Sequence, residues 1–313
     1  MCGQAGIVFG KKRRSKKERF ELLTLFKMLL ILNQKRGVDA TGVALVNAHG
    51  GYQLYKTADS ANKFLRDKDA RSIINVDELT EQTTLLAGHT RWATVGSPKN
   101  SRNNHPIVAG SIIGTHNGTI TNADAVAKTL GVQRRAKVDS EVIFRIASTL
   151  CLNAGRIDMD KIKENMHLLR GEMSSIMVSR HDPKTVIILK GTKPLALRYC
   201  KKARAVIYSS EAIHLDAVVA GSSLKWERLT SKKNSYLRFN HANMSTYFKG
   251  KFEIQKALPK YKSFRNSRSS FSSLPDDWAD SKLYNGFEDG NLAMTYYPAD
   301  EHRKKKKKKR KKK

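Results

Sequence analysis

The chain has few acidic residues for its many basic ones. It contains 28 Asp and Glu against 59 Lys and Arg, which gives a formal net charge of +31 over 313 residues. Residues 303–313 are all basic, so the rest of the chain still carries +20 (31 − 11). A field of this sign disfavours basic partners and favours polyanions, nucleic acid first and anionic surfaces second. The alternatives are a charge that only aids solubility, or a localisation address.

Cysteines and long apolar runs are also scarce. Cys2, Cys151 and Cys200 are odd in number and lack metal-binding spacing, which excludes a disulfide framework and predicts free thiols in a reducing cytoplasm. The richest apolar run, Leu22–Leu32, is about half of the ~20 residues that a membrane span needs, and it contains Lys27. The N-terminus lacks the apolar centre of a signal peptide. We therefore expect no membrane segment, while 40% hydrophobic residues suffice for a core.

The first ten residues, MCGQAGIVFG, place a cysteine directly after the initiator methionine. Met aminopeptidase removes Met1 when the next side chain is small, so the mature chain is expected to begin at Cys2. Its α-amine, with a pKa of roughly 7.7–8.0, can then accept the proton of its own thiol. Such N-terminal nucleophiles are a known route to covalent catalysis. Alone, the segment is more typical of a buried first strand with a chance cysteine.

Three later motifs carry groups that could bind an amide substrate. GHTRWAT (88–94) offers Arg91, which can fork onto a carboxylate, and the hydroxyl of Thr94. HNGTITN (116–122) offers the Asn117 amide and, at Gly118, a backbone N–H that a ligand can approach, together a two-donor oxyanion hole. VDSEV (138–142) offers Asp139 for an ammonium group. Taken singly, these are also typical of a surface ion pair, an Asn-Gly hairpin turn and a helix cap.

Hydrophobic periodicity predicts alternating strands and helices. The helix over 18–35 is apolar nearly all round, which predicts packing between other elements. The basic segment 11–17, KKRRSKK, is interpreted as a solvated turn, with phosphate contact as the alternative. Further helices are expected over 122–130, 139–150 and 161–169. Strands are expected over 6–10, 43–46, 52–55, 85–87, 107–113, 174–178, 186–189, 195–199 and 205–208, with weaker signals over 236–239 and 244–254. Residues 258–313 lack periodicity and are predicted to form a disordered tail.

In combination, the motifs resemble the class II glutamine amidotransferases, N-terminal-nucleophile (Ntn) enzymes whose glutaminase domain opens with cysteine. The likeness is greatest to the glutaminase domain of glucosamine-6-phosphate synthases and extends over about residues 2–255. The family's motifs occur here in the family's order: Cys2-Gly3, RGVDATG (36–42), GHTRWAT, Asn104-His105-Pro106, HNG, Asp139–Val142 and Ser209-Ser210-Glu211.

The resemblance implies an α+β fold, the four-layer α/β/β/α sandwich of Ntn hydrolases, in a domain over 2–257. It implies that Cys2 is the nucleophile and that Asn117 and Gly118 form the oxyanion hole. In the substrate site, it assigns Arg91 to the glutamine carboxylate and Asp139 to the ammonium group. Trp92 and Thr94 would shape the pocket wall, and Arg36 would support the nucleophile. No metal or cofactor is implied.

Two departures from the family pattern limit this interpretation. Val95 stands where relatives often carry His, which puts substrate affinity in doubt more than chemistry. The family's second, synthase half has no counterpart, so we expect the ammonia acceptor on a partner protein, or a chain that is only a glutaminase. Candidate acceptors are a nucleobase, an amino-sugar precursor and an activated carboxylate.

Two rival functions and the role of the tail remain open at this point. One rival is a catalytically retired amidotransferase fold that binds nucleic acid, and the other is an Ntn acylase acting on another amide. The intact set of Cys2, Arg91, Asn117 and Asp139 argues against both. The run Arg303–Lys313 is expected to hold the enzyme near nucleic acid, where a partner modifies a base, or to serve as a localisation address.

Overall fold

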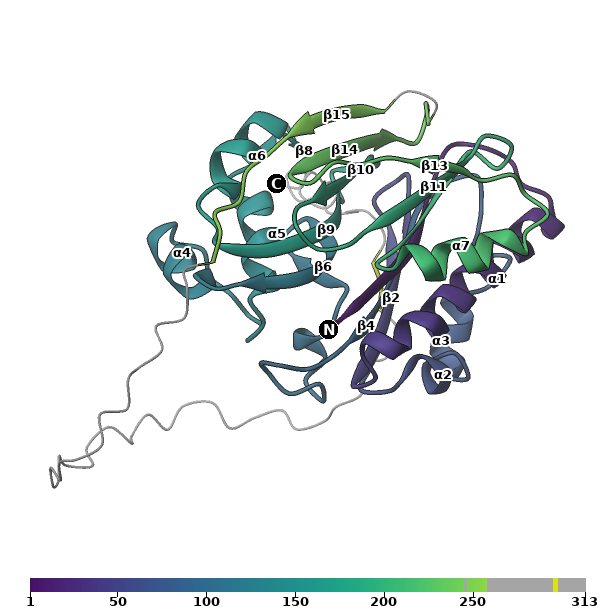
Figure 1. The fold of residues 1–313 in the computed structure, drawn as a ribbon, viewed down its shortest axis with the longest axis horizontal. Helices are drawn as coiled ribbons and strands as arrows, with labels where there is room; N and C mark the ends of the chain where they lie inside the picture. The colour runs from purple at the N-terminus through teal and green to yellow at the C-terminus, as the bar shows by residue number, and fades with distance from the viewer. Residues whose placement is uncertain (245–246, 258–294, 298–313) are drawn as a thin grey trace, which may run out of the picture.

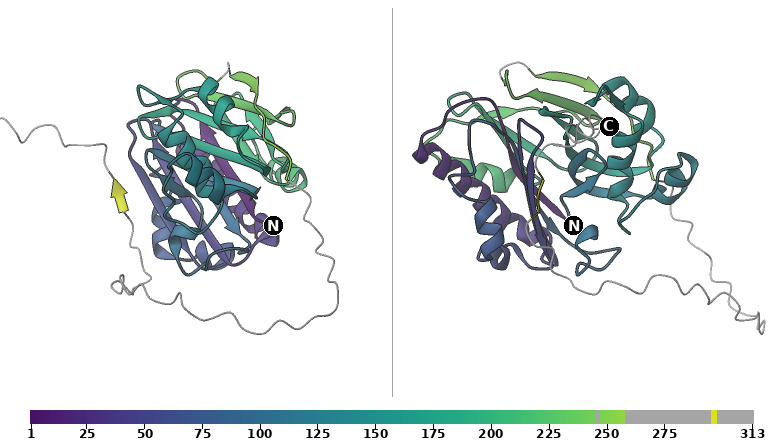
Figure 2. Two further views of the ribbon diagram at one scale, coloured as in Figure 1. Left: turned by 90° about the vertical axis from the view of Figure 1, so that its left-hand side faces the viewer. Right: turned by 180° about the vertical axis from the view of Figure 1, so that it is seen from behind.

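Two β-sheets face each other at the centre of the protein, and helices cover the outer face of each (Figure 1). The computed structural model describes residues 1–244, 247–257 and 295–297. In Figure 1, α1, α2, α3 and α7 lie on one side of the sheets, and α4, α5 and α6 lie on the other; Figure 2 shows the same arrangement from two further directions. The layers therefore follow the order helix, sheet, sheet, helix.

The first sheet is eight-stranded in the order β13-β11-β12-β1-β4-β2-β3-β16. Its strands are β1 (Gly3–Phe9), β2 (Ala40–Asn47), β3 (Tyr52–Thr57), β4 (Thr83–Arg91), β11 (Ala196–Cys200), β12 (Ala205–Ser209), β13 (Glu227–Leu229) and β16 (Thr295–Tyr297). The second sheet is six-stranded in the order β15-β14-β10-β9-β6-β5. Its strands are β5 (Ile107–Ala109), β6 (Ile112–Ile120), β9 (Gly171–Ser179), β10 (Asp182–Lys190), β14 (Ser235–Asn240) and β15 (Phe248–Lys251). A separate hairpin pairs β7 (Leu152–Asn153) with β8 (Arg156–Ile157).

The N-terminal strand β1 lies inside the first sheet, between β12 and β4, and both pairings are antiparallel. Its side chains alternate between two apolar clusters. Ala5, Ile7 and Phe9 pack toward the helices, and Val8 packs between the sheets. Because both faces are buried, the strand is apolar almost throughout. This central place fixes the position of Cys2, which directly precedes the strand.

Three apolar clusters separate the four layers. One lies between the two sheets, and the other two fill the spaces between each sheet and its helices. The helices are α1 (Lys16–Asn33), α2 (Ala61–Phe64), α3 (Lys68–Ile73), α4 (Ala123–Thr129), α5 (Ser140–Thr149), α6 (Met159–Met166) and α7 (Ala212–Ala220), with short 3₁₀ turns at Gln34–Arg36 and Ser101–Asn103. The predicted four-layer α/β/β/α class is confirmed.

Helix α1 buries one face and leaves the opposite one in solvent. Ser15 caps its first turn in a capping box with Glu18. Leu22, Leu23, Leu25, Phe26, Leu29 and Leu30 are buried against β1 and β4. The prediction that this helix packs between other elements all round was wrong, because Phe20, Met28 and Ile31 lie on its outer face and are 64%, 44% and 41% exposed.

Periodicity missed helices α2, α3 and α7. The first two are one or two turns long, too short for a 3.6-residue pattern to appear. Helix α7 has the sequence AIHLDAVVA, which is apolar on nearly all sides and therefore lacks an amphipathic pattern. It packs on α1 and beside β11 and β12.

The predicted tail, 258–313, lies outside the described residues except for Thr295–Tyr297. Those three residues form β16, which pairs antiparallel with β3 at the edge of the first sheet. In the part of the chain that the structure describes, no helix is both long enough and apolar enough to span a bilayer.

Candidate active site

The candidate site lies where the beginning of β1 meets the end of β4. Their antiparallel register places Gly3 opposite Thr90, so Cys2 adjoins Arg91 and Trp92. The second sheet contributes Asn117 on β6, whose side chain reaches the backbone of Cys2. These contacts join parts of the chain that are about a hundred residues apart in the sequence.

Cys2 is half-buried, and both its thiol and its carbonyl are engaged. Sγ lies 3.4 Å from the backbone nitrogen of Trp92, which donates to it. The carbonyl oxygen accepts from Nε of Arg36 at 2.7 Å and from Nδ2 of Asn117 at 2.9 Å. Burial raises the pKa of the thiol, and Asp139 adds to the rise, while the Trp92 N–H, the N-terminal charge and Arg91 oppose it. The thiol is therefore protonated at neutral pH and needs a base.

Met1 lies in solvent, with 72% of its surface exposed. In this structure it still precedes Cys2, whose nitrogen is therefore a peptide amide and cannot act as a base. The exposure leaves the Met1–Cys2 bond accessible to an aminopeptidase, which would create the amine next to the thiol.

Arg36 links Cys2 to the residues that follow β12. Its side chain is 9% exposed and forms an ion pair with Glu211, while Nε donates to the Cys2 carbonyl. The structure thus places Arg36 against Cys2, and the supporting role assigned from the resemblance stays a prediction. Glu211 belongs to a motif of the resemblance, but sequence reasoning gave it no role.

Asn117 is held by two acceptors. Its Nδ2 donates to the Cys2 carbonyl and, at 2.7 Å, to Oγ of Ser210. Ser210 also accepts from the backbone nitrogen of Gln4 at 2.7 Å. The sequence analysis assigned no role to Ser210, although this residue stands beside Glu211 at the end of the strand that pairs with β1. The amide donor is thereby held against the backbone of Cys2, and its role in an oxyanion hole stays a prediction.

Gly118 has a backbone conformation that requires glycine. Its φ is +140°, outside the region open to residues with a Cβ, and an added Cβ would overlap with the carbonyl oxygen of Glu172 on β9. The Asn-Gly pair thus lies within strand β6 (Ile112–Ile120) rather than in a hairpin turn.

We expect Gly118→Ala to destabilise the protein. Strain at a left-handed φ costs on the order of 1–3 kcal/mol, and the overlap with Glu172 adds to it. Urea unfolding should show a lower midpoint. Gly131→Ala is the matched control, because Gly131 has φ +62° but an added Cβ would meet nothing within 4 Å. If Gly118→Ala lowered stability no more than Gly131→Ala, the close approach to β9 would carry no cost.

Arg91 is buried, and its guanidinium holds the segment that follows it. It donates to Oδ1 of Asn104 at 2.8 Å and to the carbonyls of Val95 at 2.6 Å and Gly96 at 2.8 Å. Asp39 adds a contact to the same segment by accepting from the backbone nitrogen of Ala93 at 2.7 Å. Arg91 is therefore not in an exposed ion pair, and its role in carboxylate binding stays a prediction.

The pocket-wall residues Trp92 and Thr94 lie on this segment and are exposed, with Trp92 at 51%. Val95, the departure from the family pattern, is 59% exposed beside them. All three lie at the surface, and the backbone of Trp92 contacts the thiol of Cys2. Their part in a pocket wall stays a prediction.

Asp139 occupies the N-cap position of α5, yet its side chain caps no helical N–H. Its Oδ2 instead accepts from the backbone nitrogen of Ile120 at 2.5 Å, at the end of β6. The capping interpretation is therefore wrong. The carboxylate lies close enough to Cys2 to influence the thiol pKa, which agrees with a place in the same site.

Three motif histidines meet behind the site, a feature that sequence reasoning did not find. His89 and His105 have ring centroids 4.2 Å apart, and Nε2 of His89 lies 3.2 Å from the carbonyl oxygen of His116. Burial lowers the pKa of all three, that of His89 to about 3, so the cluster is neutral at pH 7. Among the described residues, no three His, Cys, Asp or Glu side chains are arranged to hold a metal ion.

Sequence comparison identifies relatives for this arrangement. Residues 89–217 match a family model described as a glutamine amidotransferase domain. Glutamine–fructose-6-phosphate aminotransferase (isomerizing) of Vibrio vulnificus is 25% identical over 171 residues, which cover 52% of this chain and 26% of the relative. The enzyme of the same name from Bartonella henselae is 29% identical over 208 residues, 64% of this chain and 30% of the relative. The chain thus spans less than a third of the length of these relatives.

Structure comparison agrees with the sequence. The glutamine phosphoribosylpyrophosphate amidotransferase of B. subtilis, complexed with ADP and GMP, matches with a TM-score of 0.58 at 18% identity. The match covers 80% of this chain and 49% of the other. A structure described as the allosteric regulatory enzyme of purine biosynthesis matches with a TM-score of 0.60 at 18% identity, with the same coverage. At this identity the likeness concerns the fold, and together the comparisons confirm the resemblance found in the sequence.

Proposed function

We propose that this chain, which carries a class II glutamine amidotransferase domain, hydrolyses glutamine to glutamate and ammonia with Cys2 as the nucleophile. The observation that supports it most directly is the contact between Nδ2 of Asn117 and the carbonyl of Cys2, beside a protonated thiol and an exposed Met1. It supports the proposal because a thiol, an amide donor and an exposed first residue lie close together.

The proposed reaction begins after Met1 is removed. The free amine of Cys2 takes the thiol proton, directly or through a water, and the thiolate attacks the side-chain amide carbon of glutamine. Asn117 and the backbone N–H of Gly118 stabilise the oxyanion. The C–N bond breaks, the proton passes to the leaving nitrogen, and ammonia departs. Water then hydrolyses the γ-glutamyl thioester to glutamate and restores the thiol.

Asn117 must change partners during this cycle. Both of its amide hydrogens already have acceptors, the Cys2 carbonyl and Oγ of Ser210. One of them therefore has to turn to the oxyanion as it forms. Arg36 keeps its own bond to the Cys2 carbonyl, so that oxygen is not left unpaired when Asn117 moves.

Arg91 and Asp139 are proposed to bind the α-carboxylate and α-ammonium of glutamine. Asp139→Asn keeps an oxygen for the Ile120 N–H but removes the charge, and Arg91→Lys keeps the charge but removes the fork. Losing one charge-assisted contact costs about 1.5–3 kcal/mol. We therefore expect glutamine kcat/KM to fall roughly ten- to hundredfold in each variant, measured by glutamate release.

Substrate analogues separate this binding role from a structural one. N-acetylglutamine lacks the ammonium group, so Asp139→Asn should hardly lower its already poor turnover. Glutaminamide lacks the α-carboxylate, so Arg91→Lys should hardly lower the turnover of this analogue. Equal losses on glutamine and on the matching analogue would show that these residues only hold the fold.

The proposed use of the ammonia rests on the net charge of the chain. We place the acceptor on a partner protein, and the +31 charge favours a partner that modifies a nucleic-acid base over one that handles an amino sugar or a carboxylate. The run Arg303–Lys313 would hold the enzyme there, although it lies outside the described residues. The free thiols of Cys2, Cys151 and Cys200 support a cytoplasmic site of action.

Two rival functions give different assay results. A retired scaffold that binds nucleic acid would release no glutamate, although the site contacts of Cys2 and Asn117 are in place. An Ntn acylase would prefer other amides to free glutamine in a substrate panel. The charged pair Arg91 and Asp139 favours a free α-amino acid.

A further inference from the structure

Two basic segments far apart in the sequence meet at the end of β1 that is remote from Cys2. Strand β1 is antiparallel to β12, with Phe9 opposite Ala205. The segment 11–17 that leaves β1 therefore lies beside the turn 201–204 that enters β12. Gly10 donates its N–H to the carbonyl of Arg204 at 2.7 Å, which joins the two segments directly.

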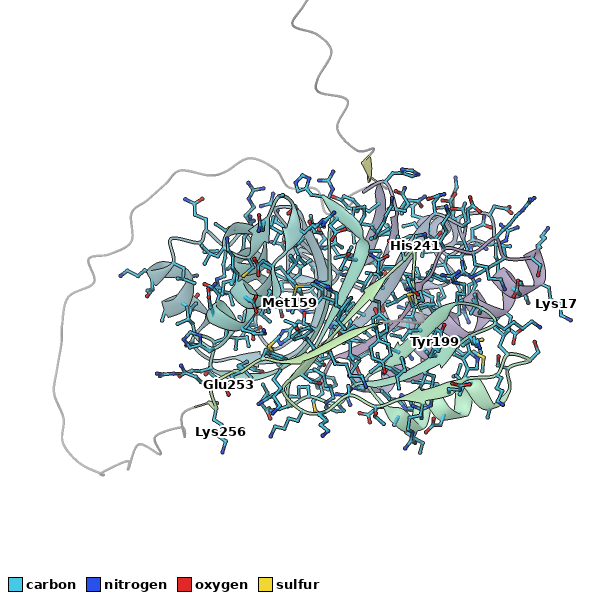
Figure 3. All side chains as sticks on the ribbon, turned by 90° about the horizontal axis from the view of Figure 1, so that it is seen from above. Lys17, Met159, Tyr199, His241, Glu253 and Lys256 are labelled. Carbon is cyan, nitrogen blue, oxygen red and sulfur yellow. The ribbon has the colours of Figure 1, made fainter. Side chains whose placement is uncertain are left out.

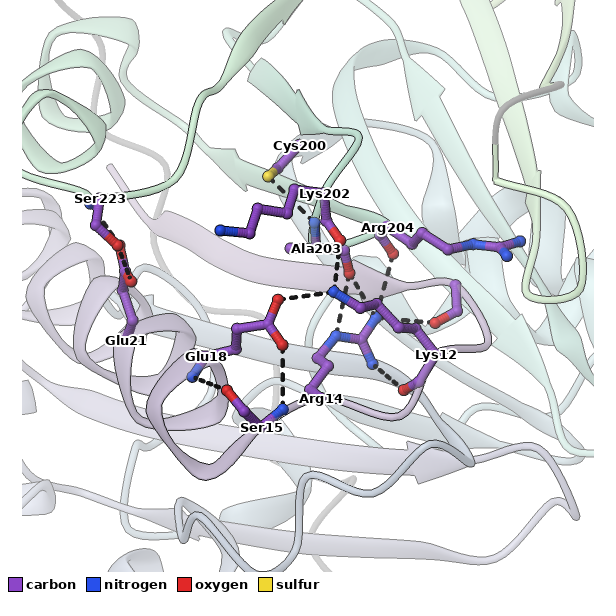
Figure 4. Close-up of polar contacts among 11 residues, drawn as sticks. Lys12, Arg14, Ser15, Glu18, Glu21, Cys200, Lys202, Ala203, Arg204 and Ser223 are labelled. Carbon is purple, nitrogen blue, oxygen red and sulfur yellow. Dashed lines mark hydrogen bonds and ion pairs between the residues drawn. The ribbon is translucent and has the colours of Figure 1, made fainter.

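Arg14 and Lys12 fasten these segments together. Arg14 is 6% exposed, and its guanidinium donates to the carbonyls of Gly10 at 2.8 Å and Ala203 at 2.9 Å. Nζ of Lys12 bridges Oε1 of Glu18 at 2.7 Å and the carbonyl of Lys202 at 2.6 Å. Figure 4 shows the side chains of Arg14 and Lys12 with their hydrogen bonds. The bonds of Arg14 and Lys12 therefore hold the two basic segments together against the repulsion between their like charges.

Apart from the half-buried Arg204, the other cations of the two segments face solvent. We call them the basic end face: Lys11, Arg13, Lys16, Lys17, Lys201 and Lys202, all exposed. Lys17 projects outward at the end of the molecule opposite Met159 of α6 (Figure 3). Glu18, the nearest acid in the sequence, is already paired with Lys12. Glu18 therefore neutralises none of the six charges of the basic end face.

A cavity of about 340 Å³ adjoins this face. It is lined by Arg13, Arg14, Arg19, Leu79, Thr80 and Glu81. Nε of Arg19 is buried there and has no hydrogen-bond partner among the described residues. A buried donor without a partner costs free energy unless a ligand satisfies it. Arg14 is already bonded to backbone carbonyls, and Nη1 of Arg19 donates to the carbonyl of Val76 at 2.9 Å and lies 4.0 Å from Asp77. Arg13 and Nε of Arg19 are therefore the donors left for an anion with several oxygens, such as a phosphate group.

We infer that the basic end face binds the phosphate backbone of a nucleic acid, with one phosphate at the arginine cavity. Six separate cations fit a polymer of phosphates better than a single anion. An anionic membrane is the less favoured partner, because segments 11–17 and 201–204 contain no large apolar side chain to enter the lipid. This inference deepens the proposed role near nucleic acid, but it does not rest on glutamine hydrolysis.

The face lies well away from Cys2. Strand β1 has seven residues and separates the two sites by roughly 23 Å at about 3.3 Å per residue. A bound nucleic acid would therefore leave the glutamine site open. It would also place the target for a partner enzyme on the same molecule that releases ammonia.

The test compares two triple variants of the full-length chain. Lys11, Lys16 and Lys17→Gln removes three charges from the face and spares the fastening residues. Lys63, Lys128 and Lys161→Gln removes three exposed charges elsewhere. Binding to a 20-base-pair DNA duplex and to single-stranded RNA is measured by fluorescence anisotropy from 50 to 200 mM salt. Phosphatidylserine vesicles form a third arm, and truncation after Asp300 is combined with each variant to separate the tail.

Each lost phosphate contact should flatten the plot of log affinity against log salt by about 0.9 on duplex DNA. The face variant should therefore lose a slope of about 2.7, which makes its affinity roughly 40-fold less sensitive to salt across this range, while the control variant keeps most of the wild-type slope. Equal slopes for the two variants, with and without the tail, would overturn the inference, as would tighter binding to vesicles than to nucleic acid. Glutamate release by the face variant should equal that of the wild type. If the wild type itself released no glutamate, the proposed function would be contradicted, and the binding result would still stand.

Discussion

Cys2→Ala is expected to abolish the release of glutamate from glutamine and to leave the fold intact. The sulfur of this half-buried side chain hydrogen-bonds to the backbone of Trp92, and the substitution removes a single heavy atom, so little packing is lost. Removing the nucleophile of a comparable covalent enzyme lowers kcat by about 10⁶-fold, and we expect a fall to the background of the assay. Cys151→Ala is the matched control, because it deletes a thiol from the opposite helix layer. Circular dichroism should be the same for all three proteins.

A second measurement, the intact mass of active protein, tests how the thiol of Cys2 is activated. Burial raises the thiol pKa, so below that pKa the thiol reacts only when a base takes its proton. With Met1 attached, the nitrogen of Cys2 is an amide and no such base exists there. Intact-mass analysis of active protein should therefore show the loss of one methionine. Full activity in protein that retains Met1 would contradict the mechanism.

The second large effect is expected at Asn117. Asn117→Ala removes the amide donor that points at the Cys2 carbonyl, and losing one oxyanion donor lowers kcat about 10²- to 10³-fold, or about 2.7–4 kcal/mol. KM should change little, because the donor acts on charge that develops only in the transition state. Steady-state glutamate release over a range of glutamine concentrations separates the two constants.

Two further variants sharpen this test. Asn117→Asp keeps the size of the side chain but replaces the donor with an acceptor facing the Cys2 carbonyl, so it should be no more active than Asn117→Ala. Ser210→Ala removes one acceptor and leaves the donor in place, so it should lower kcat much less. If Asn117→Ala changed KM alone, the oxyanion assignment would have to be withdrawn.

The order of the motifs allowed the fold to be predicted, although periodicity alone did not. Patterns of apolar residues found α1, α4, α5, α6 and most strands, because those elements bury one face or run through the centre of a sheet. They failed at α7, which is apolar on nearly all sides, and at the outer face of α1, where Phe20, Met28 and Ile31 remain exposed. Whether an apolar residue is covered depends on which elements pack there, and that information is not local.

The same limit applies to the residues around Cys2. GHTRWAT, HNG and Ser209-Ser210-Glu211 were visible as motifs, but the bonds from Asn117 to Ser210 and from Arg36 to Glu211 were not. Asp139 occupies the cap position that its sequence suggested, yet its carboxylate turns to Ile120. Local sequence can give the position of a side chain in a helix, whereas its direction depends on the strand packed against it.

By itself, the sequence determined the chemistry available to this protein: a thiol at position 2, an amide at Asn117 and a large excess of positive charge. These follow from residue identity and order, which need no coordinates. Only the tertiary structure decided which groups meet. Antiparallel pairing of β1 with β4 and β12 brings Cys2 to Trp92 at one end of the strand and segment 11–17 to the turn 201–204 at the other. Contacts across 90 to 190 residues depend on strand register, which is set by the burial of whole sheets rather than by any short stretch of sequence.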